Sequence, residues 1–519
     1  MPDNAPQMTR SIKFISLWSS ATIIVVAVIL IGGKIEPTPW THITVSGTEC
    51  VDSSVNGWYF PSGKHRCTST EASKGTIYRD SIYYAFQVPQ VEGDEASRYS
   101  RWQWRLYGVL RLRLVLNNDN AVMKPDPPHK IILKSRLGYM NKNDHYKPTL
   151  IAANYQERKL YCVFIKKHSF DELTYDCSPQ VVVVLYSVHH DHYLINILLP
   201  LFRDDTNEWV NRNFEAVKGL YITFFSLSSW YTKMLVSLQT VFFPVLATIL
   251  WRFWKSFSVF ERRPDHLERD LALLAVALTV MNCPLEFVTL IGDCPWLIVI
   301  NDIRQTFFYA SFMTFFLYLT DRHVEPGRLC PHSRKGIDLY IRSGTLAILI
   351  VDMIEHIIML DRPLAMTYES MHMSMSLVGF SLLGCYLTCI TIRTCSALVA
   401  INQKGPVHEG DTGCQEAVIL IITWVCFSLT AADFIIKRLH EGMWMWEYTM
   451  GQLEIMNTCG FLLGIYCMWN VYTCVLLVIF TPFSKTPQPR GRFDMSRVVG
   501  VPLGTQQYPS FVDMRVTTL

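Results

Sequence analysis

The sequence predicts a membrane protein with an N-terminal transmembrane anchor, an external β-sandwich and a seven-helix transmembrane bundle, eight spans in total. The first observation is the order of the hydrophobic segments, because one apolar span precedes a long polar stretch and the others follow it almost back to back. Each such segment supplies the about 20 apolar residues that a bilayer core about 30 Å thick requires. The second observation is the composition, 50% hydrophobic and 18% charged, which is too apolar for a soluble enzyme.

The first span covers residues 14–33 and follows a short segment, residues 1–13, that carries Arg10 and Lys13. No small-x-small cleavage site follows the apolar run, where the sequence reads Gly-Gly-Lys-Ile-Glu-Pro. We interpret this span as an uncleaved signal anchor, with a cleaved signal peptide as the alternative. The two basic residues before it place the N-terminus in the cytosol.

The external domain, residues 34–228, is predicted to be a β-sandwich. Its strand candidates are rich in Val, Ile, Tyr and Leu and are bounded by Pro, Gly, Asn or Asp. They are residues 81–88, 104–116, 130–137, 160–166, 181–187 and 193–199. A last strand near Leu220 to Phe225 runs into the next membrane helix with almost no linker, so we expect the domain to sit on the bundle.

Four of the 15 cysteines lie in this external domain, as two close pairs. In an oxidising compartment they predict two disulfides between sequence neighbours, Cys50 with Cys67 and Cys162 with Cys177. Four cysteines allow three connectivities, so crossed pairings remain open at this point.

The bundle, residues 229–482, is predicted to contain seven spans. They cover residues 230–254, 270–291, 295–320, 338–360, 372–400, 415–437 and 453–482. Basic residues follow the second and fourth of the eight spans and recur in the tail, which places both termini in the cytosol and the sandwich in the lumen. The tail, residues 483–519, is rich in Pro, Gly, Arg and Thr and is predicted to be disordered.

Charged residues within predicted spans gather in the luminal half of the bundle. They are Glu286, Asp302, Arg304, Asp352, Glu355 and Asp433. Because charges inside membranes usually face a bundle interior or a water-filled cavity, they predict a polar vestibule above an apolar interior. Such a site fits an amphipathic ligand with an apolar tail. The alternative is that these residues only hold helices together, with Glu286 and Arg304 as one buried pair.

The cytoplasmic half is read as almost free of charge, with Asn470 as its deepest strong polar group. On the last predicted span, Gly460 and Gly464 form a G-x-x-x-G pattern, which predicts close packing against another helix.

Catalytic, metal and nucleic-acid signatures are weak. Asp302 and Asp352 could suggest an intramembrane aspartyl dyad, but neither has a recognisable nucleophile or metal context. The run from His189 to His192 lacks partners at ligand spacing and predicts a surface turn rather than a metal site. There is no P-loop or H-E-x-x-H motif. The net charge of +3 comes from dispersed basic residues. We therefore expect no enzyme, no cofactor, no metal and no nucleic-acid partner.

Several motifs point to one family. Residues 301–310 read N-D-I-R-Q-T-F-F-Y-A, residues 282–287 read N-C-P-L-E-F, and residues 441–446 read E-G-M-W-M-W. Further matches are G-I-Y-C-M-W-N at 464–470, and S-R-W-Q at 100–103 with Y-L-I-N-I at 193–197 in the external domain. With these motifs the chain resembles a divergent member of the Wntless (Evi) family of Wnt cargo receptors over about residues 14–485.

The resemblance implies a sandwich like the GOLD domain and a bundle that receives the palmitoleoyl chain of Wnt. Candidate residues of the ligand and lipid cavity are then Glu286, Asp302, Arg304, Phe308, Tyr309, Asp352, Glu355, His356, Asp433, Tyr466, Trp469 and Asn470. It also implies loading in the endoplasmic reticulum, passage through the Golgi to the plasma membrane, and return through endosomes. The implied partners are lipid-modified Wnt proteins, membrane lipids, endocytic adaptors and retromer-type recycling machinery.

The chain departs from the family pattern at three places. His356 stands where relatives carry arginine, so a fixed charge becomes titratable, and Cys467 replaces a glycine. The loop at 401–414 lacks the tyrosine-based sorting motif of relatives. The tail instead offers Tyr508-Pro-Ser-Phe511, a Y-x-x-Φ sequence that an adaptor can bind as an extended peptide. Antibody uptake at the cell surface tests this candidate sorting signal.

Two other functions fit a seven-helix protein. A signalling receptor would carry long basic cytoplasmic loops, whereas the loops here are short. A transporter is disfavoured because neither an inverted repeat nor a pair of broken helices is recognisable in the sequence.

Overall fold

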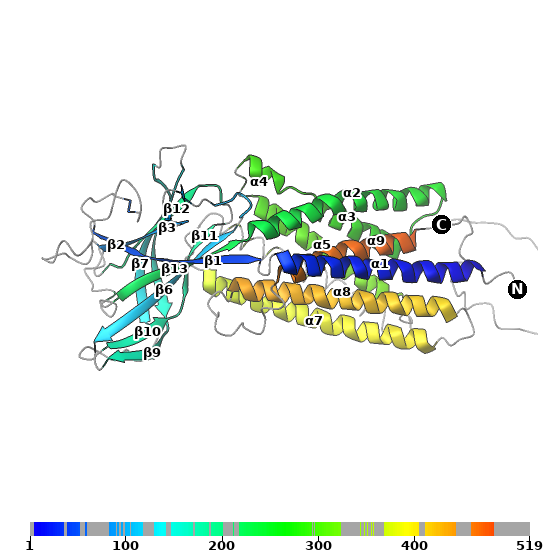
Figure 1. The fold of residues 1–519 in the computed structure, drawn as a ribbon. Coiled ribbons are helices and arrows are strands. Elements are labelled where there is room, and N and C mark those ends of the chain that lie inside the picture. The colour runs from blue at the N-terminus through cyan, green and yellow to red at the C-terminus, as the bar shows by residue number, and fades with distance from the viewer. Residues whose placement is uncertain are drawn as a thin grey trace, which may run out of the picture.

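The computed structural model places a β-sandwich at one end of a set of long helices that run away from it (Figure 1). The described residues are 5–35, 39–51, 58–59, 82–89, 91–92, 95–96, 99–103, 105–117, 129–141, 147–169, 172–185, 188–200, 211, 217–292, 294, 296–322, five positions between 343 and 357, 368–403, 410–442 and 458–481.

The helices of the described chain are α1 (Ala5–Ile35), α2 (Ser229–Val259), α3 (His266–Met281), α4 (Phe287–Ile291), α5 (Leu297–Asp321), α7 (Tyr368–Gln403), α8 (Gly410–Gly442) and α9 (Cys459–Phe480). Within the described residues, five stretches are long and apolar enough to cross a membrane: Ser16–Lys34, Ser229–Val259, Leu377–Gln403, Cys414–Ile435 and Cys459–Phe480. In the predicted span 338–360 five positions are described, and all are helical. A β-domain followed by several apolar helices is therefore confirmed.

Tryptophan side chains mark both ends of the apolar part of α2. Trp230 and Trp251 are 58% and 59% exposed, and their separation along the helix is about 32 Å at about 1.5 Å per residue. Lys233 lies over the Trp230 ring and Lys255 over the Trp251 ring, at 5.5 and 4.8 Å from the centroids. Such spacing matches the hydrocarbon thickness of a bilayer with an aromatic residue at each interface.

The sandwich consists of two antiparallel sheets. One follows the order β1 (Trp40–Ser46), β13 (Val217–Leu227), β6 (Leu106–Asn117), β10 (Glu172–Cys177) and β9 (Cys162–Ser169), with β11 (Gln180–Leu185) also paired with β6. The other follows β2 (Thr48–Val51), β3 (Ile82–Val88), β12 (His192–Leu198), β7 (His129–Met140) and β8 (Thr149–Leu160). A short ribbon pairs β4 (Val91–Glu92) with β5 (Glu95–Ala96).

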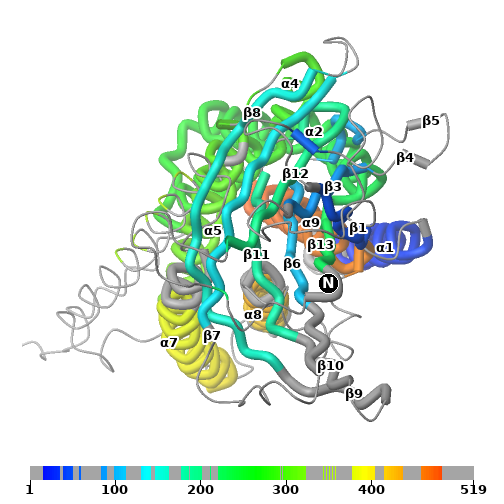
Figure 2. Tube along the Cα trace, turned by 90° about the vertical axis from the view of Figure 1, so that its left-hand side faces the viewer, coloured from blue at the N-terminus to red at the C-terminus, as the bar shows by residue number. Residues whose placement is uncertain are grey.

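The sandwich core lies between these two sheets. Buried side chains from one sheet, such as Leu110 and Ile222, share an apolar cluster with Phe86 and Ile195 of the other. Viewed along the long axis of the molecule, the strands lie across the end of the helices (Figure 2). The sheets thus form a separate hydrophobic core next to that of the bundle.

One predicted strand is wrong in its bounds. Residues 160–166 were expected to form a single strand, but β8 ends at Leu160 and β9 begins at Cys162. The sequence also failed to predict β1, β2, β8 and β10. On β8 the exposed and buried positions alternate over its second half, and its outward residues include Glu157 and Lys159. Polar outward residues dilute the apolar signal, so a half-exposed edge strand is easily overlooked.

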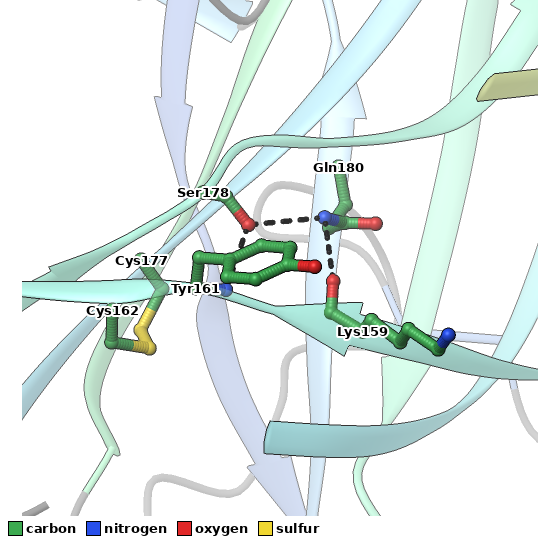
Figure 3. The surroundings of a disulfide bond; sticks show 6 residues. All are labelled: Lys159, Tyr161, Cys162, Cys177, Ser178 and Gln180. Carbon is green, nitrogen blue, oxygen red and sulfur yellow. Dashed lines mark hydrogen bonds between the residues drawn. A yellow bond between two sulfur atoms is a disulfide. The ribbon is translucent and has the colours of Figure 1, made fainter. Parts of the chain in front are cut away.

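Cys162 and Cys177 are joined by a disulfide that links the facing ends of β9 and β10. The connection is held by local hydrogen bonds (Figure 3): the Tyr161 amide donates to Ser178 Oγ at 3.1 Å, and Gln180 Nε2 donates to the Lys159 carbonyl at 3.3 Å. Cys50 is also disulfide-bonded. Its predicted partner Cys67 lies outside the described residues, so that pairing stays a prediction.

The sandwich and the helices are joined through two paired strands. β13 leads into α2 with only Ser228 between them, and its neighbour β1 follows the anchor helix α1. The Ser228 amide donates to the Pro39 carbonyl at 2.8 Å, which fixes the two connections side by side. A junction this short restricts rotation of the sandwich relative to the membrane helices.

The anchor helix α1 packs against α9 through glycine. A Cβ atom added at Gly460 would lie 2.5 Å from the Ile29 carbonyl oxygen, and one added at Gly464 would overlap the Ile29 side chain. Ala21 and Trp18, nearer the N-terminus of α1, lie against Val471 and Tyr472 of α9. The G-x-x-x-G pattern therefore serves close packing of the N-terminal helix, which joins the bundle rather than lying apart from it.

Candidate functional site

The predicted continuous span over residues 270–291 is wrong, because the helix breaks in its middle. α3 ends at Met281 with Asn282 as its C-cap, and α4 begins only at Phe287. Pro284 lacks an amide hydrogen and disfavours a helical conformation of the residue before it. The break leaves carbonyl groups without their helical partners inside the bundle, and each of these requires another donor.

Arg304 on α5 supplies donors to this break. Its Nη1 atom donates to the Cys283 and Val280 carbonyls at 2.5 and 3.4 Å, and Nη2 donates to Glu286 Oε1 at 3.0 Å. Nη2 also contacts the Asn301 side-chain oxygen. Glu286 and Arg304 are 2% and 6% exposed, so this is a buried ion pair that joins α5 to the turn between α3 and α4.

A second polar link connects the same break to α9. Asn282 Nδ2 donates to Asn470 Oδ1 at 2.5 Å, and the Tyr466 hydroxyl donates to the Asn282 side-chain oxygen. Asn470 in turn donates to the Tyr466 carbonyl at 2.9 Å. All three side chains are buried. Asn282 thus ties α3 to α9 at the level where the helix ends.

An aromatic cluster, formed by Phe308, Tyr309, Tyr466 and Trp469, lies beside these polar links. Phe308 follows Arg304 by one helical turn on α5. Its ring centroid is 5.0 Å from that of Trp469, and Tyr309 meets Trp469 edge to face at 5.9 Å. Trp469 Nε1 donates to Thr430 Oγ1 on α8 at 2.8 Å. The aromatic cluster therefore lies next to the buried Glu286–Arg304 pair, on the side away from the sandwich.

One side of α5 remains half-buried. Asp302, Gln305 and Tyr309 share it at helical spacing, and Gln305 Nε2 donates to the Tyr309 hydroxyl at 2.7 Å. Unlike Glu286 and Arg304, which are buried, these side chains are partly accessible. This side of α5 thus carries partly accessible polar groups next to the aromatic cluster.

The remaining predicted site residues fall into two groups. Asp433 is buried on α8, and Asp302 is half-buried on α5. Asp352, Glu355, His356, Tyr508 and Phe511 lie outside the described residues. The structure therefore brings together Glu286 with Arg304, Asn470 with Tyr466, and Phe308 and Tyr309 with Trp469.

The prediction that the cytoplasmic half of the bundle is almost free of charge is wrong. At the end of the bundle away from the sandwich, α5 and α7 share a charged pair. Arg393 on α7 donates to Asp321 on α5 at 3.0 Å, and their side chains are 8% and 17% exposed. Arg393 lies inside the predicted span 372–400, so its charge was visible in the sequence. Its partner Asp321 is the last residue of α5 and lies one residue beyond the predicted span 295–320. In the sequence, Asp321 is therefore indistinguishable from a charge at the membrane interface.

The predicted histidine turn lies at the start of β12. His190 stacks on Tyr139 with ring centroids 3.5 Å apart, and the Asp191 amide donates to Asn141 Oδ1 at 3.2 Å. Among the described residues no group of three or more His, Cys, Asp or Glu side chains could hold a metal ion. The run acts as a folded turn of the sandwich.

Two family models match the chain. One, described as Wntless, GOLD domain, matches residues 48–226, and the other, described as Wntless-like, transmembrane domain, matches residues 228–484. Protein wntless of Drosophila mojavensis is 28% identical over 505 residues, 91% of this chain and 88% of the relative. Protein wntless of Drosophila ananassae is 28% identical over 489 residues, 88% of this chain and 85% of the relative. The two matched domains correspond to the sandwich from β2 onward and to the helices from α2 onward.

Proposed function

The chain belongs to the Wntless family, and on that premise we propose that it is a carrier that binds lipid-modified Wnt proteins in the lumen and escorts them to the cell surface. It is a multi-pass membrane protein with a GOLD domain in front of its transmembrane domain. In the proposed role it binds and releases cargo and performs no covalent chemistry.

The observation that best supports this proposal is that the aromatic cluster lies next to the buried Glu286–Arg304 pair. An acyl chain is apolar along its length and carries polar ester atoms at one end. Entry beside α5 would place the chain against Phe308 and Tyr309, and the ester near the donors of Arg304 and Gln305. Glu286 and Arg304 already neutralise each other's charge through their ion pair, so a ligand does not have to do so.

The energetics explain why such a protein needs two contact surfaces. About 12 methylene groups at roughly 0.8 kcal/mol each make an exposed palmitoleoyl chain very unfavourable in water. A bilayer already removes that cost, so moving the chain from lipid into protein gains little. Affinity for the cargo must therefore come from polar contacts near the break and from the protein part of Wnt on the sandwich.

We also propose eight spans, with both termini in the cytosol and the sandwich in the lumen. The tryptophan spacing on α2 supports a membrane around the helices. Arg252 lies in the last third of α2, and Arg262 and Arg263 lie beyond its end opposite the sandwich; such basic residues favour the cytosolic side.

In the proposed cycle the carrier travels from the endoplasmic reticulum through the Golgi to the plasma membrane and returns through endosomes. Recycling would use endocytic adaptors and retromer-type machinery, with Tyr508 and Phe511 as the candidate signal. His356 is the candidate for a change in cargo affinity with compartment pH. Both features stay predictions.

Co-purification with Wnt tests the proposed function. We expect the full chain to retain acylated Wnt and to lose at least about tenfold in affinity, about 1.4 kcal/mol, for a Wnt variant that cannot be acylated. The reason is that only the acylated form reaches the aromatic cluster. Binding of both Wnt forms at equal affinity, or of neither, would contradict the proposal.

A further inference from the structure

Residues 99–103 of the sandwich form a compact turn whose role the lipid site does not explain. The Gln103 amide donates to the Ser100 carbonyl at 2.9 Å, and the Ser100 amide donates to Gln103 Oε1 at 2.9 Å. Tyr99 packs edge to face on Tyr193 of β12 at 6.3 Å. The turn is therefore internally bonded and anchored to the sandwich core.

This turn contacts α4. Arg101 Nη1 donates to the Leu290 carbonyl at 2.8 Å, and the Trp102 ring meets the Phe287 ring edge to face at 6.3 Å. In Figure 1 the short helix α4 lies at the sandwich end of the bundle, where such contacts can form. A helix of five residues is too short to be stable by itself. Its position must be set by its neighbours, and Arg101 and Trp102 are two of them.

The N-terminal end of α4 adjoins the buried ion pair. Glu286 is the N-cap residue of α4, and Thr289 Oγ1 donates back to the Glu286 carbonyl at 2.7 Å. The Glu286 carboxylate accepts from Arg304, which precedes Phe308 by one turn of α5. A continuous series of contacts thus runs from the sandwich turn through α4 to α5, which carries Phe308 and Tyr309 of the aromatic cluster.

We propose that Arg101 and Trp102 are positioning residues for acyl binding. By fixing the position of α4 they hold Glu286 against Arg304. They thereby couple docking of the cargo protein on the sandwich to binding of the acyl chain in the bundle. The inference rests on the proposed function and adds a route between its two contact surfaces. Neither residue has to touch the acyl chain for this effect.

The test uses the full chain in nanodiscs and a short peptide that carries a palmitoleoyl ester, with the unacylated peptide as the blank. The peptide supplies the lipid without the body of the cargo protein, so contacts to the sandwich surface cannot explain an effect. We expect Trp102→Ala to weaken binding about tenfold, and Trp102→Phe to restore most of it. Phe287→Ala should cause a similar loss. The double variant should bind no worse than either single variant, because both changes remove the same contact.

Tyr161→Ala is the control, since Tyr161 is a sandwich aromatic between β8 and β9 that is 59% exposed and lies beside the disulfide, whereas Trp102 is half-buried. It should leave peptide affinity unchanged. Unchanged affinity in Trp102→Ala, or losses that add in the double variant, would overturn the coupling while leaving the proposed function intact. If the wild-type chain binds acylated and unacylated peptide equally, the proposed function itself fails.

Discussion

An Arg304→Leu variant is expected to lose about 3–5 kcal/mol of stability, among the largest effects of any single side-chain change in the bundle. The substitution leaves the Glu286 carboxylate buried without its cation and removes the donors to the Val280 and Cys283 carbonyls. A second change, Glu286→Gln, should recover part of this loss, because it removes the unpaired buried charge. Thermal unfolding of the purified full chain, compared among the wild type, both single variants and the double variant, measures the coupling.

An exposed ion pair provides the control. Lys130 and Glu157 are 2.7 Å apart on the sandwich, but their side chains are 69% and 43% exposed. Glu157→Ala should therefore cost no more than about 1 kcal/mol. If the double variant Arg304→Leu/Glu286→Gln is no more stable than Arg304→Leu alone, the two groups do not act as a pair.

The second large effect is expected at the contact between α1 and α9. Gly464→Leu should separate these helices, because even a Cβ atom at this position overlaps the Ile29 side chain. Overpacking of a fitted interface costs typically about 1–3 kcal/mol, and here the contact involves the backbone of both helices at Gly460 and Gly33. We expect the thermal midpoint of the full chain in detergent to fall and the yield of folded protein to drop.

Gly384→Leu on α7 is the matched control, since a Cβ atom at Gly384 would meet nothing within 4 Å. It should leave the midpoint unchanged or raise it, because leucine favours a helix more than glycine does. Equal losses from both substitutions would show that the Gly464 effect reflects any added side chain rather than contact with α1.

The order of domains could be predicted because each depends on local patterns. Apolar stretches of membrane length and strands bounded by turn residues are visible without knowledge of the fold. A possible pairing of Glu286 with Arg304 was also visible, because charges in apolar helices need partners. The family motifs then added Phe308, Tyr309 and Trp469, which are isolated hydrophobic residues in the sequence alone.

The geometry of the site could not be predicted in the same way. Pro284 signals a break, but the sequence does not say that Arg304 replaces the missing helical hydrogen bonds. The G-x-x-x-G pattern predicts a close neighbour for α9 without identifying α1. The partners of Asn282 and Arg101 lie 188 and 189 residues away. Such contacts between distant segments are set by tertiary packing, which has no local signature.

The central claim is that the acyl chain of the cargo enters the bundle beside α5, below the buried ion pair. The most direct measurement uses Wnt whose acyl chain carries a photoreactive group at its end, bound to the full-length carrier, irradiated and mapped by peptide mass spectrometry. We expect crosslinks to the peptides of α5 and α9 that contain Phe308, Tyr309 and Trp469. Crosslinks confined to the sandwich, or to outward positions such as Leu377 and Ile392, which are 67% and 62% exposed, would contradict it.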